Sequence, residues 1–165
     1  MRVFGIDPGC TVTGFAVITS SRGRLRLVDS GCFRTKATDP MPERLARIYD
    51  GLFEALERTA PDVVAIEAIF RHKSSESALR LGQARGVALL AAAKQGLDLF
   101  EYNAMTVKKT VGAHGRADKK AVARVVSMLL GEELPGPGRP LDVADAAAIA
   151  ITHCSHSRSV MATSR

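Results

Sequence analysis

Tryptophan is absent from this sequence of 165 residues, and cysteine is scarce, with Cys10, Cys32 and Cys154 forming no CxxC pair. Three widely separated cysteines exclude a disulfide-rich miniprotein and indicate reduced thiols, as in a cytoplasmic protein. Long hydrophobic runs are also absent: the longest, 86–93, is far shorter than the ~20 residues that cross a bilayer. Asp7 interrupts the N-terminal apolar run too early for a signal peptide. We therefore expect a cytoplasmic protein with no membrane partner.

Acidic residues are in the minority, with 17 Asp and Glu against 23 Lys and Arg, which gives a net charge of +6. A basic surface favours polyanionic partners such as nucleic acid, although many small basic proteins bind nothing anionic. Hydrophobic residues make up 46% of the chain, which excludes an intrinsically disordered protein. The length suits one compact domain, which we expect to span residues 1–156, followed by a frayed polar tail at 157–165.

The hydrophobic pattern predicts an α/β fold. Strands are expected at 3–6, 14–19, 25–33, 63–66 and 97–102, and helices at 42–60, 76–95, 107–111, 118–130 and 142–153. The first three strands are joined by short connections, which favours an antiparallel meander, and the continuous apolar run of the fourth is typical of a buried parallel strand. The first helix has one apolar face, with charged residues such as Arg44 elsewhere around it. This order predicts one mixed five-stranded sheet with helices on both faces.

Acidic residues fall where two of these strands end. Asp7 follows the first strand and Glu67 follows the fourth. If these strands are parallel neighbours, both carboxylates lie at the sheet edge where such folds bind their ligands. Asp142 and Asp145 are three residues apart and share one face at the start of the last helix, which could bring them to the same edge. Each residue alone also has an ordinary explanation, as a turn aspartate, a solvated glutamate or a helix cap.

Four carboxylates in one cleft need protons or cations, because two of them ~5 Å apart repel by roughly 3 kcal/mol at an effective dielectric constant near 20. Oxygen ligands without cysteine or clustered histidine indicate Mg²⁺ or Mn²⁺. Two such ions ~3.5–4 Å apart can activate water and stabilise a leaving oxygen in phosphodiester cleavage. An acidic metal site in a net-positive chain therefore predicts a nuclease.

Four sequence blocks carry a resemblance to a known family. They are Gly5-Ile6-Asp7-Pro8-Gly9 with Thr13-Gly14-Phe15, Ile66-Glu67 with Phe70, the stretch 77–86, and 142–147 with 149–153. In this order and at this spacing, they make the chain resemble the bacterial RuvC Holliday-junction resolvases over about residues 2–156. The resemblance is to crossover junction endodeoxyribonucleases with a single RNase H-like nuclease domain.

The resemblance implies a homodimer that resolves four-way DNA junctions in recombination and DNA repair, together with the RuvA–RuvB branch-migration machinery. It implies paired symmetric nicks with 5′-phosphate and 3′-hydroxyl ends. It also implies Asp7, Glu67, Asp142 and Asp145 as the catalytic, metal-binding residues, with two Mg²⁺ ions for each active site and Mn²⁺ as a substitute.

The resemblance also implies roles for several basic residues and one aromatic residue. Lys108 and Lys119 fall where the family keeps lysines near the scissile phosphate, although general phosphate contacts or solvated lysines are the alternative. Phe70 falls where the family has a wedge that stacks on junction bases, and a core phenylalanine is the alternative. The further residues expected to bind DNA are Arg71, Lys73, Lys109, Arg116 and Lys120.

Some features have two explanations that the sequence leaves open. Gly82 and Gly86 let a helix approach a neighbour closely, either a second copy of the chain or its own sheet. His153 and His156 lack the neighbours of a metal site and are expected at the surface or behind the active site. An actin-like or sugar-kinase ATPase would need two such domains. A DNA-binding module without catalytic activity would have lost an acidic residue, but all four are present. Against a nuclease that cuts RNA–DNA hybrids, the resemblance is the one argument.

Overall fold

The computed structural model describes residues 1–68, 75–112, 118–134, 136 and 140–163, and side chains as far as residue 157. Five strands form one sheet in the order β3-β2-β1-β4-β5. They are β1 Arg2–Asp7, β2 Val12–Ser21, β3 Arg24–Arg34, β4 Val63–Glu67 and β5 Asp98–Tyr102. β1, β2 and β3 pair antiparallel, and β1, β4 and β5 pair parallel. The predicted meander, the buried parallel strand and the mixed five-stranded sheet are confirmed.

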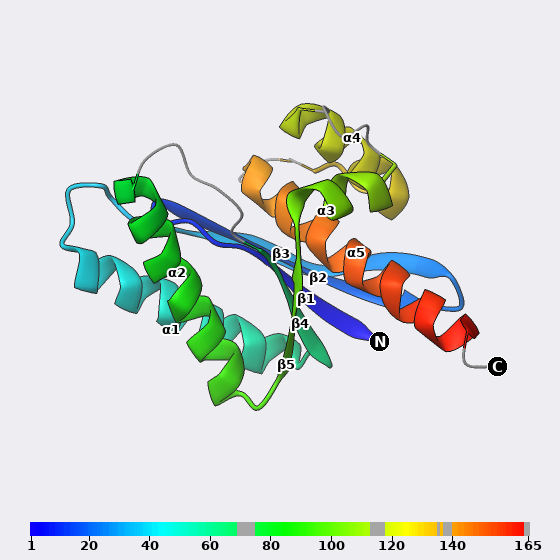
Figure 1. Cartoon of the computed structure of the whole chain (residues 1–165), viewed down its shortest axis with the longest axis horizontal. Coiled ribbons are helices and arrows are strands. Elements are labelled where there is room, and N and C mark those ends of the chain that lie inside the picture. The colour runs from blue at the N-terminus through cyan, green and yellow to red at the C-terminus, as the bar shows by residue number, and fades with distance from the viewer. Residues whose placement is uncertain (69–74, 113–117, 135, 137–139, 164–165) are drawn as a thin grey trace.

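Helices cover both faces of this sheet, as predicted. They are α1 Met41–Thr59, α2 Ser75–Lys94, α3 Ala104–Thr110, α4 Lys119–Leu130 and α5 Leu141–Thr163. α1 and α2 lie on one face, and α3, α4 and α5 lie on the other (Figure 1). The last helix does not end near His153, as the sequence pattern indicated, but continues to Thr163. No helix in the described part of the chain is long and apolar enough to cross a membrane.

The start of α5 lies directly on the backbone of β1 and β2, because glycines leave room for it. A Cβ on Gly5 would overlap the carbonyl oxygen of Ala146, and a Cβ on Gly14 would overlap that of Asp142. The backbone of α5 is therefore in direct contact with the backbone of the sheet where the helix begins. This close approach sets the position of the two aspartates in the first turns of α5.

The opposite face of the sheet carries an aromatic core beneath α1 and α2. Phe15 stacks between Phe4 and Phe33, with ring centroids 5.2 and 5.4 Å away. The residues that α2 buries in this core are all alanines, Ala84, Ala88, Ala91 and Ala92, and the partly buried Val87 packs against it. α1 buries apolar residues at helical spacing, as predicted, but it also buries Arg44, which the pattern had grouped with the charged residues around the helix.

Candidate active site

Asp7 and Glu67 end neighbouring parallel strands. Their predecessors, Ile6 and Ile66, are partners in the register of β1 and β4, so both carboxylates lie at the same edge of the sheet. Side chains alternate between the two faces of a strand. Asp7 comes after the buried residues of β1, and its side chain points to the face of the sheet that α5 covers. The juxtaposition expected from the two strand ends is present in the structure.

α5 brings the second pair of carboxylates to this edge. Asp142 lies in its first turn, over Gly14, and Asp145 follows one turn later. The side chain of Asp145 is 19% exposed and that of Asp142 is 31% exposed, so the second aspartate lies deeper in the site. Three separate elements thus supply the four acidic groups.

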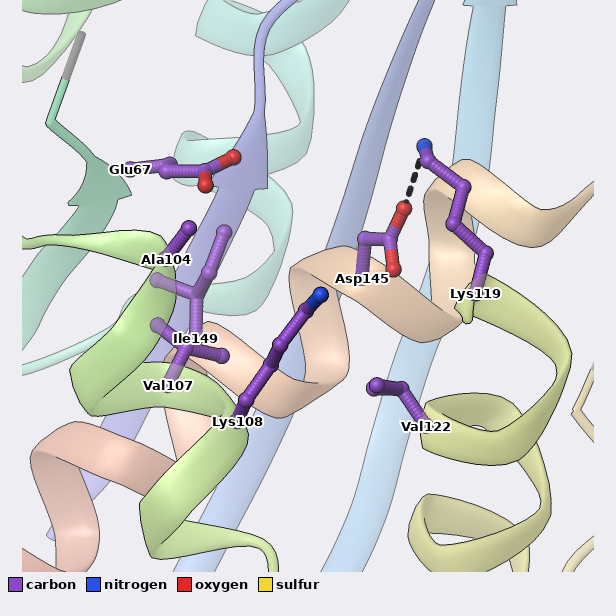
Figure 2. Close-up of a pocket in the computed structure, with 8 residues that line it drawn as sticks. All are labelled: Glu67, Ala104, Val107, Lys108, Lys119, Val122, Asp145 and Ile149. Carbon is purple, nitrogen blue, oxygen red and sulfur yellow. Dashed lines mark ion pairs between the residues drawn. The ribbon is translucent and has the colours of Figure 1, made fainter. Parts of the chain in front are cut away.

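Two lysines reach the same place from α3 and α4. The ammonium nitrogen of Lys119 lies 2.6 Å from Oδ2 of Asp145 and 3.9 Å from Oδ1 of Asp142. Lys108 extends from α3 into the space between Glu67 and Asp145 (Figure 2). Asp118 caps α4 by accepting a hydrogen bond from the backbone N–H of Ala121, which fixes where Lys119 begins the helix.

Glu67, Asp145 and the two lysines line a cavity of about 170 Å³, whereas Asp7 and Asp142 are neighbours of these groups and not part of its lining. Its lining residues are Glu67, Ala104, Val107, Lys108, Lys119, Val122, Asp145 and Ile149 (Figure 2). The apolar residues of this lining were not predicted from the sequence as part of the site. Ile149 could have been, because it follows Asp145 by four residues and therefore lies on the same face of the helix.

Burial and mutual repulsion raise the pKa of two of the carboxylates, Asp7 and Glu67. Burial, followed by the charge of Asp145, raises the pKa of Asp7 to about 8. The same two causes raise the pKa of Glu67; Lys119 opposes both shifts, and Lys108 opposes that of Glu67. Burial lowers the pKa of Lys119, but its hydrogen bond to Asp145 and the surrounding carboxylates outweigh burial and raise it overall. Without another cation, the site therefore retains a proton on Asp7 at neutral pH.

The donor set suits a hard divalent cation, because it consists of carboxylate oxygens with no thiolate or imidazole. In the described residues, however, no three His, Cys, Asp or Glu side chains converge closely enough to hold a metal ion as they stand. The ammonium group of Lys119 lies against two of the carboxylates instead. A metal ion on these carboxylates would therefore compete with the ammonium group of Lys119.

The other predicted DNA-binding residues divide into two groups. Lys109 and Lys120 are exposed and adjacent to the two lysines of the cavity, but they do not line it. The remaining predictions fall outside the residues that the structure describes; they are Phe70, Arg71, Lys73 and Arg116.

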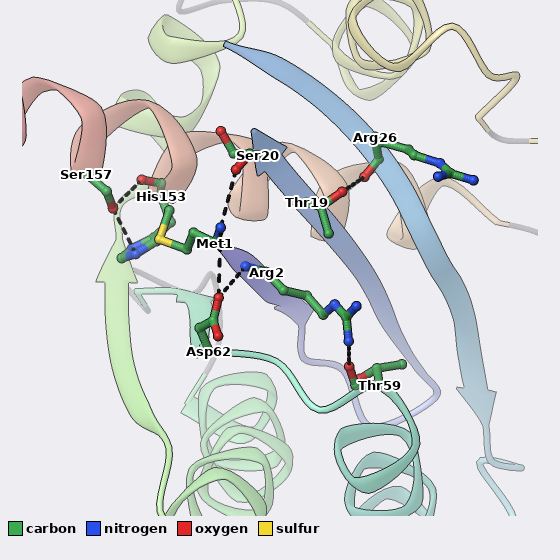
Figure 3. Close-up of polar contacts among 9 residues, drawn as sticks. All are labelled: Met1, Arg2, Thr19, Ser20, Arg26, Thr59, Asp62, His153 and Ser157. Carbon is green, nitrogen blue, oxygen red and sulfur yellow. Dashed lines mark hydrogen bonds and ion pairs between the residues drawn. The ribbon is translucent and has the colours of Figure 1, made fainter. Parts of the chain in front are cut away.

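His153 belongs to a polar cluster away from the cavity. It is buried and not at the surface, because its Nδ1 pairs with the Tyr102 hydroxyl at 2.9 Å and its Nε2 with Ser157 at 3.0 Å. Figure 3 shows this histidine near the N-terminal end of the sheet. That end is held by Arg2, whose backbone N–H donates to Asp62 at 2.6 Å and whose side chain donates to the carbonyl of Thr59 at 2.6 Å (Figure 3). The acidic groups gather at the opposite end.

Comparisons with known proteins identify the family. The family model described as "Crossover junction endodeoxyribonuclease RuvC" matches residues 3–153, a span that includes all four carboxylates and both lysines. A RuvC of Chloroflexus aggregans is 47% identical over 153 residues, covering 93% of this chain and 92% of that protein. A RuvC of Pectobacterium atrosepticum is 48% identical over 161 residues, covering 98% and 92%.

Solved structures give the same assignment. "T. thermophilus RuvC in complex with Holliday junction substrate" superposes with a TM-score of 0.88 at 37% identity, covering 96% of each chain. The yeast mitochondrial Holliday junction resolvase Ydc2, at 17% identity and a TM-score of 0.64, shares the fold. With the family model spanning the whole site and close relatives covering nearly the full length, this chain belongs to the RuvC family of crossover junction endodeoxyribonucleases.

Proposed function

We propose that the chain resolves four-way (Holliday) DNA junctions by metal-dependent phosphodiester hydrolysis, with the acidic cavity as its active site. The observation that carries this proposal is the gathering of Asp7, Glu67, Asp142 and Asp145 with two lysines in a member of the RuvC family. The junction complex of the T. thermophilus relative supports a four-way junction as the substrate, in preference to an RNA–DNA hybrid. The biological setting is recombination and DNA repair.

The four carboxylates would hold the metal, which we propose to be two Mg²⁺ ions for each site, with Mn²⁺ as a substitute. Bound there, the ions supply activation of the attacking water and stabilisation of the leaving oxygen, which yields 5′-phosphate and 3′-hydroxyl ends. The raised pKa values of Asp7 and Glu67 support a cationic partner, since a divalent charge removes the repulsion that favours protonation.

The two lysines would act on the phosphate. Lys108 extends into the cavity and is placed to neutralise charge that develops on the scissile phosphate. Lys119 pairs with Asp145, and we propose that with a metal ion held by the carboxylates it would turn to the phosphate. We also propose DNA contacts for Phe70, Arg71, Lys73, Lys109, Arg116 and Lys120.

The exposed face of α2 supports a homodimer. A Cβ on Gly82 or Gly86 would meet no atom within 4 Å, so these glycines do not pack on the protein's own sheet. Leu79 and Leu90 share this face at helical spacing and are 64% and 50% exposed. We propose that a second copy covers this face about a two-fold axis, which provides two active sites for two symmetric nicks.

We further propose that residues 1–156 form the single nuclease domain, that the protein acts in the cytoplasm, and that RuvA–RuvB are its partners. The first of these proposals is supported by the family match over residues 3–153.

A nicking assay tests the reaction and the site together. Labelled four-way junction and linear duplex of the same sequence are incubated with and without Mg²⁺, using wild type and Asp7→Asn. We expect paired, Mg²⁺-dependent cuts in the junction alone, with at least a ~10³-fold loss in Asp7→Asn because a metal ligand is removed. Junction binding without cutting, in Mg²⁺ and Mn²⁺ and across several core sequences, would refute the nuclease assignment.

The dimer is tested with Leu90→Glu, which places a charge on the exposed face of α2. We expect the sedimentation mass to fall to that of a monomer and paired cutting to be replaced by single nicks. Leu129→Glu is the matched control, because Leu129 is 45% exposed on α4, away from this face. An unchanged mass in Leu90→Glu would place the dimer interface elsewhere.

A further inference from the structure

Arg44 is a buried charge without a carboxylate partner. It is 4% exposed, which makes it the least exposed Asp, Glu, Lys or Arg among the described residues. Its Nε donates to Oγ1 of Thr35 at 3.0 Å, and its Nη2 donates to Oγ1 of Thr11 at 3.4 Å. Within the described part of the chain, Arg44 forms no ion pair. This includes the acidic residues nearest to it in sequence, Asp39 and Glu43.

Such an arrangement is costly for the free protein. A buried charge is normally paired, and a guanidinium does not escape the cost of burial by losing its proton. Guanidinium carries five N–H donors in a planar fork, and the two threonine hydroxyls accept from only two of them. The remaining donors match the paired oxygens of a phosphate.

The surroundings of Arg44 are basic and open on one side. Thr11, which accepts one of its hydrogen bonds, is exposed. Arg34 and Lys36, on either side of Thr35 in sequence, are exposed as well. The guanidinium group thus lies beneath a rim that attracts anions, and an exposed hydroxyl marks the side from which a ligand can approach.

The register of the strands gives the position of the rim residue Arg34 relative to the catalytic edge, and Arg44 reaches the same strand ends from α1, on the face of the sheet opposite α5 (Figure 1). Asp7 pairs with Gly14, Gly14 with Cys32, and Val12 with Arg34. Arg34 therefore lies two strands away and two residues beyond Asp7, which places their Cα atoms roughly 12 Å apart by strand geometry. A DNA strand with its scissile phosphate at Asp7 would carry another phosphate to this distance within a few nucleotides.

We propose that Arg44 binds a backbone phosphate of the DNA strand a few nucleotides from the cut, with Thr11 beside it and Arg34 and Lys36 at the rim. This inference rests on the proposed nuclease function. The Thr35 hydroxyl that accepts from Arg44 also donates to the carbonyl of Cys10 in the loop after Asp7. A phosphate on Arg44 is thereby connected, through one hydroxyl, to the loop that follows the catalytic aspartate, and it sets the register of the strand at the active site.

Junction binding measured against salt concentration tests the proposal. Dissociation constants for a labelled four-way junction are determined without divalent cation, so that no cutting occurs. For Arg44→Met we expect roughly 10-fold weaker binding and a salt slope smaller by about one than for wild type, as for loss of one phosphate contact. Arg58→Gln removes the same charge from the far end of α1, ~21 Å along the helix, where it pairs with Asp29. Its salt slope should equal that of wild type.

A second measurement does not depend on the folding of Arg44→Met. Single phosphates within four nucleotides of the cut are replaced by neutral methylphosphonates. Binding of each modified junction is then compared between wild type and Arg44→Lys, which keeps the positive charge but loses the planar set of guanidinium donors. We expect one position at which the replacement weakens wild type several-fold more than Arg44→Lys. Equal effects at every position, or an unchanged slope in folded Arg44→Met, would overturn the proposal and leave Arg44 a structural residue. Wild type that neither binds nor cuts junctions would instead refute the proposed function.

Discussion

Lys119 and Arg44 lie at the same edge of the sheet, but their surroundings differ in charge. Lys119 has a side chain that is 60% exposed, and it contacts two carboxylates. Arg44 is 4% exposed, and within the described part of the chain its hydrogen bonds go to hydroxyl groups alone. The comparison shows that the two cations differ in their partners. Lys119 neutralises carboxylates that the protein itself brings together for a metal, whereas Arg44 is neutralised only when an anionic ligand binds.

Removal of the Lys119 charge has the largest expected effect. In Lys119→Met, we expect cleavage of the junction in Mg²⁺ to fall by ~10²–10³-fold, because a cation next to the reacting phosphate is lost. Single-turnover rates at saturating protein measure it. Lys120→Met is the matched control, since Lys120 is exposed and does not line the cavity. We expect it to weaken junction binding alone; equal loss of rate in both variants would make Lys119 an ordinary phosphate contact.

The acidic cluster around Lys119 makes stability depend on pH. The folded pKa of Asp7, about 8, lies above the ordinary value of 3.8, so the folded state keeps a proton that the unfolded chain has lost. This contribution is fully present below pH ~4 and is lost as pH rises through ~8, by at most about 1.4 kcal/mol per pH unit. Thermal unfolding without divalent cation, from pH 5 to 9, should show this decline, and Asp7→Asn should flatten it. Parallel curves for the two proteins would contradict the raised pKa.

A smaller effect concerns competition between the lysine and the metal. Because the ammonium group of Lys119 lies against Asp145, we expect Lys119→Met to bind Mn²⁺ several-fold more tightly than wild type in the absence of DNA. Isothermal titration or paramagnetic relaxation of water measures the affinity. Weaker binding in the variant would show that the lysine supports the metal site and does not compete with it.

The smallest expected effect is on the free protein when Arg44 is replaced. Arg44→Met removes an unpaired buried charge and two hydrogen bonds to hydroxyls, contributions that oppose one another. We expect the free energy of unfolding without DNA to stay within ~1 kcal/mol of wild type, as measured by urea denaturation. A loss of several kcal/mol would mean that Arg44 holds the loop after Asp7 in place without any ligand.

The sequence predicted the parts of the site that depend on where strands end. Asp7 and Glu67 follow continuous apolar runs, and parallel pairing brings the ends of such runs together whatever the details of packing. The placement of Lys108 and Lys119 came from the resemblance alone, because helices α3 and α4 are joined to the sheet by tertiary contacts that periodicity does not encode. The sequence also left two partners open for Gly82 and Gly86, and the structure excludes the protein's own sheet.

Arg44 shows most clearly why the rest could not be predicted. Helical periodicity sorted it with charged residues that usually face water, because its burial depends on Thr11 and Thr35, which lie 33 and 9 residues away in the chain. The length of α5 is a similar case, since polar residues after His153 gave no apolar pattern to follow. The local sequence pattern identifies the faces and ends of helices and strands. Whether a charged side chain is buried depends instead on hydrogen-bond acceptors that are distant in the sequence.

The close approach of α5 to Gly5 and Gly14 has a mechanical consequence. Because the carbonyl oxygens of Ala146 and Asp142 lie where a Cβ would be, helix and strands cannot slide past one another without backbone collision. Asp7, Asp142 and Asp145 therefore move as one rigid body, and the lysines on α3 and α4 belong to separate elements. Adjustment to differently shaped junctions thus falls to the two lysines, while the backbone positions of these three acids stay fixed relative to one another.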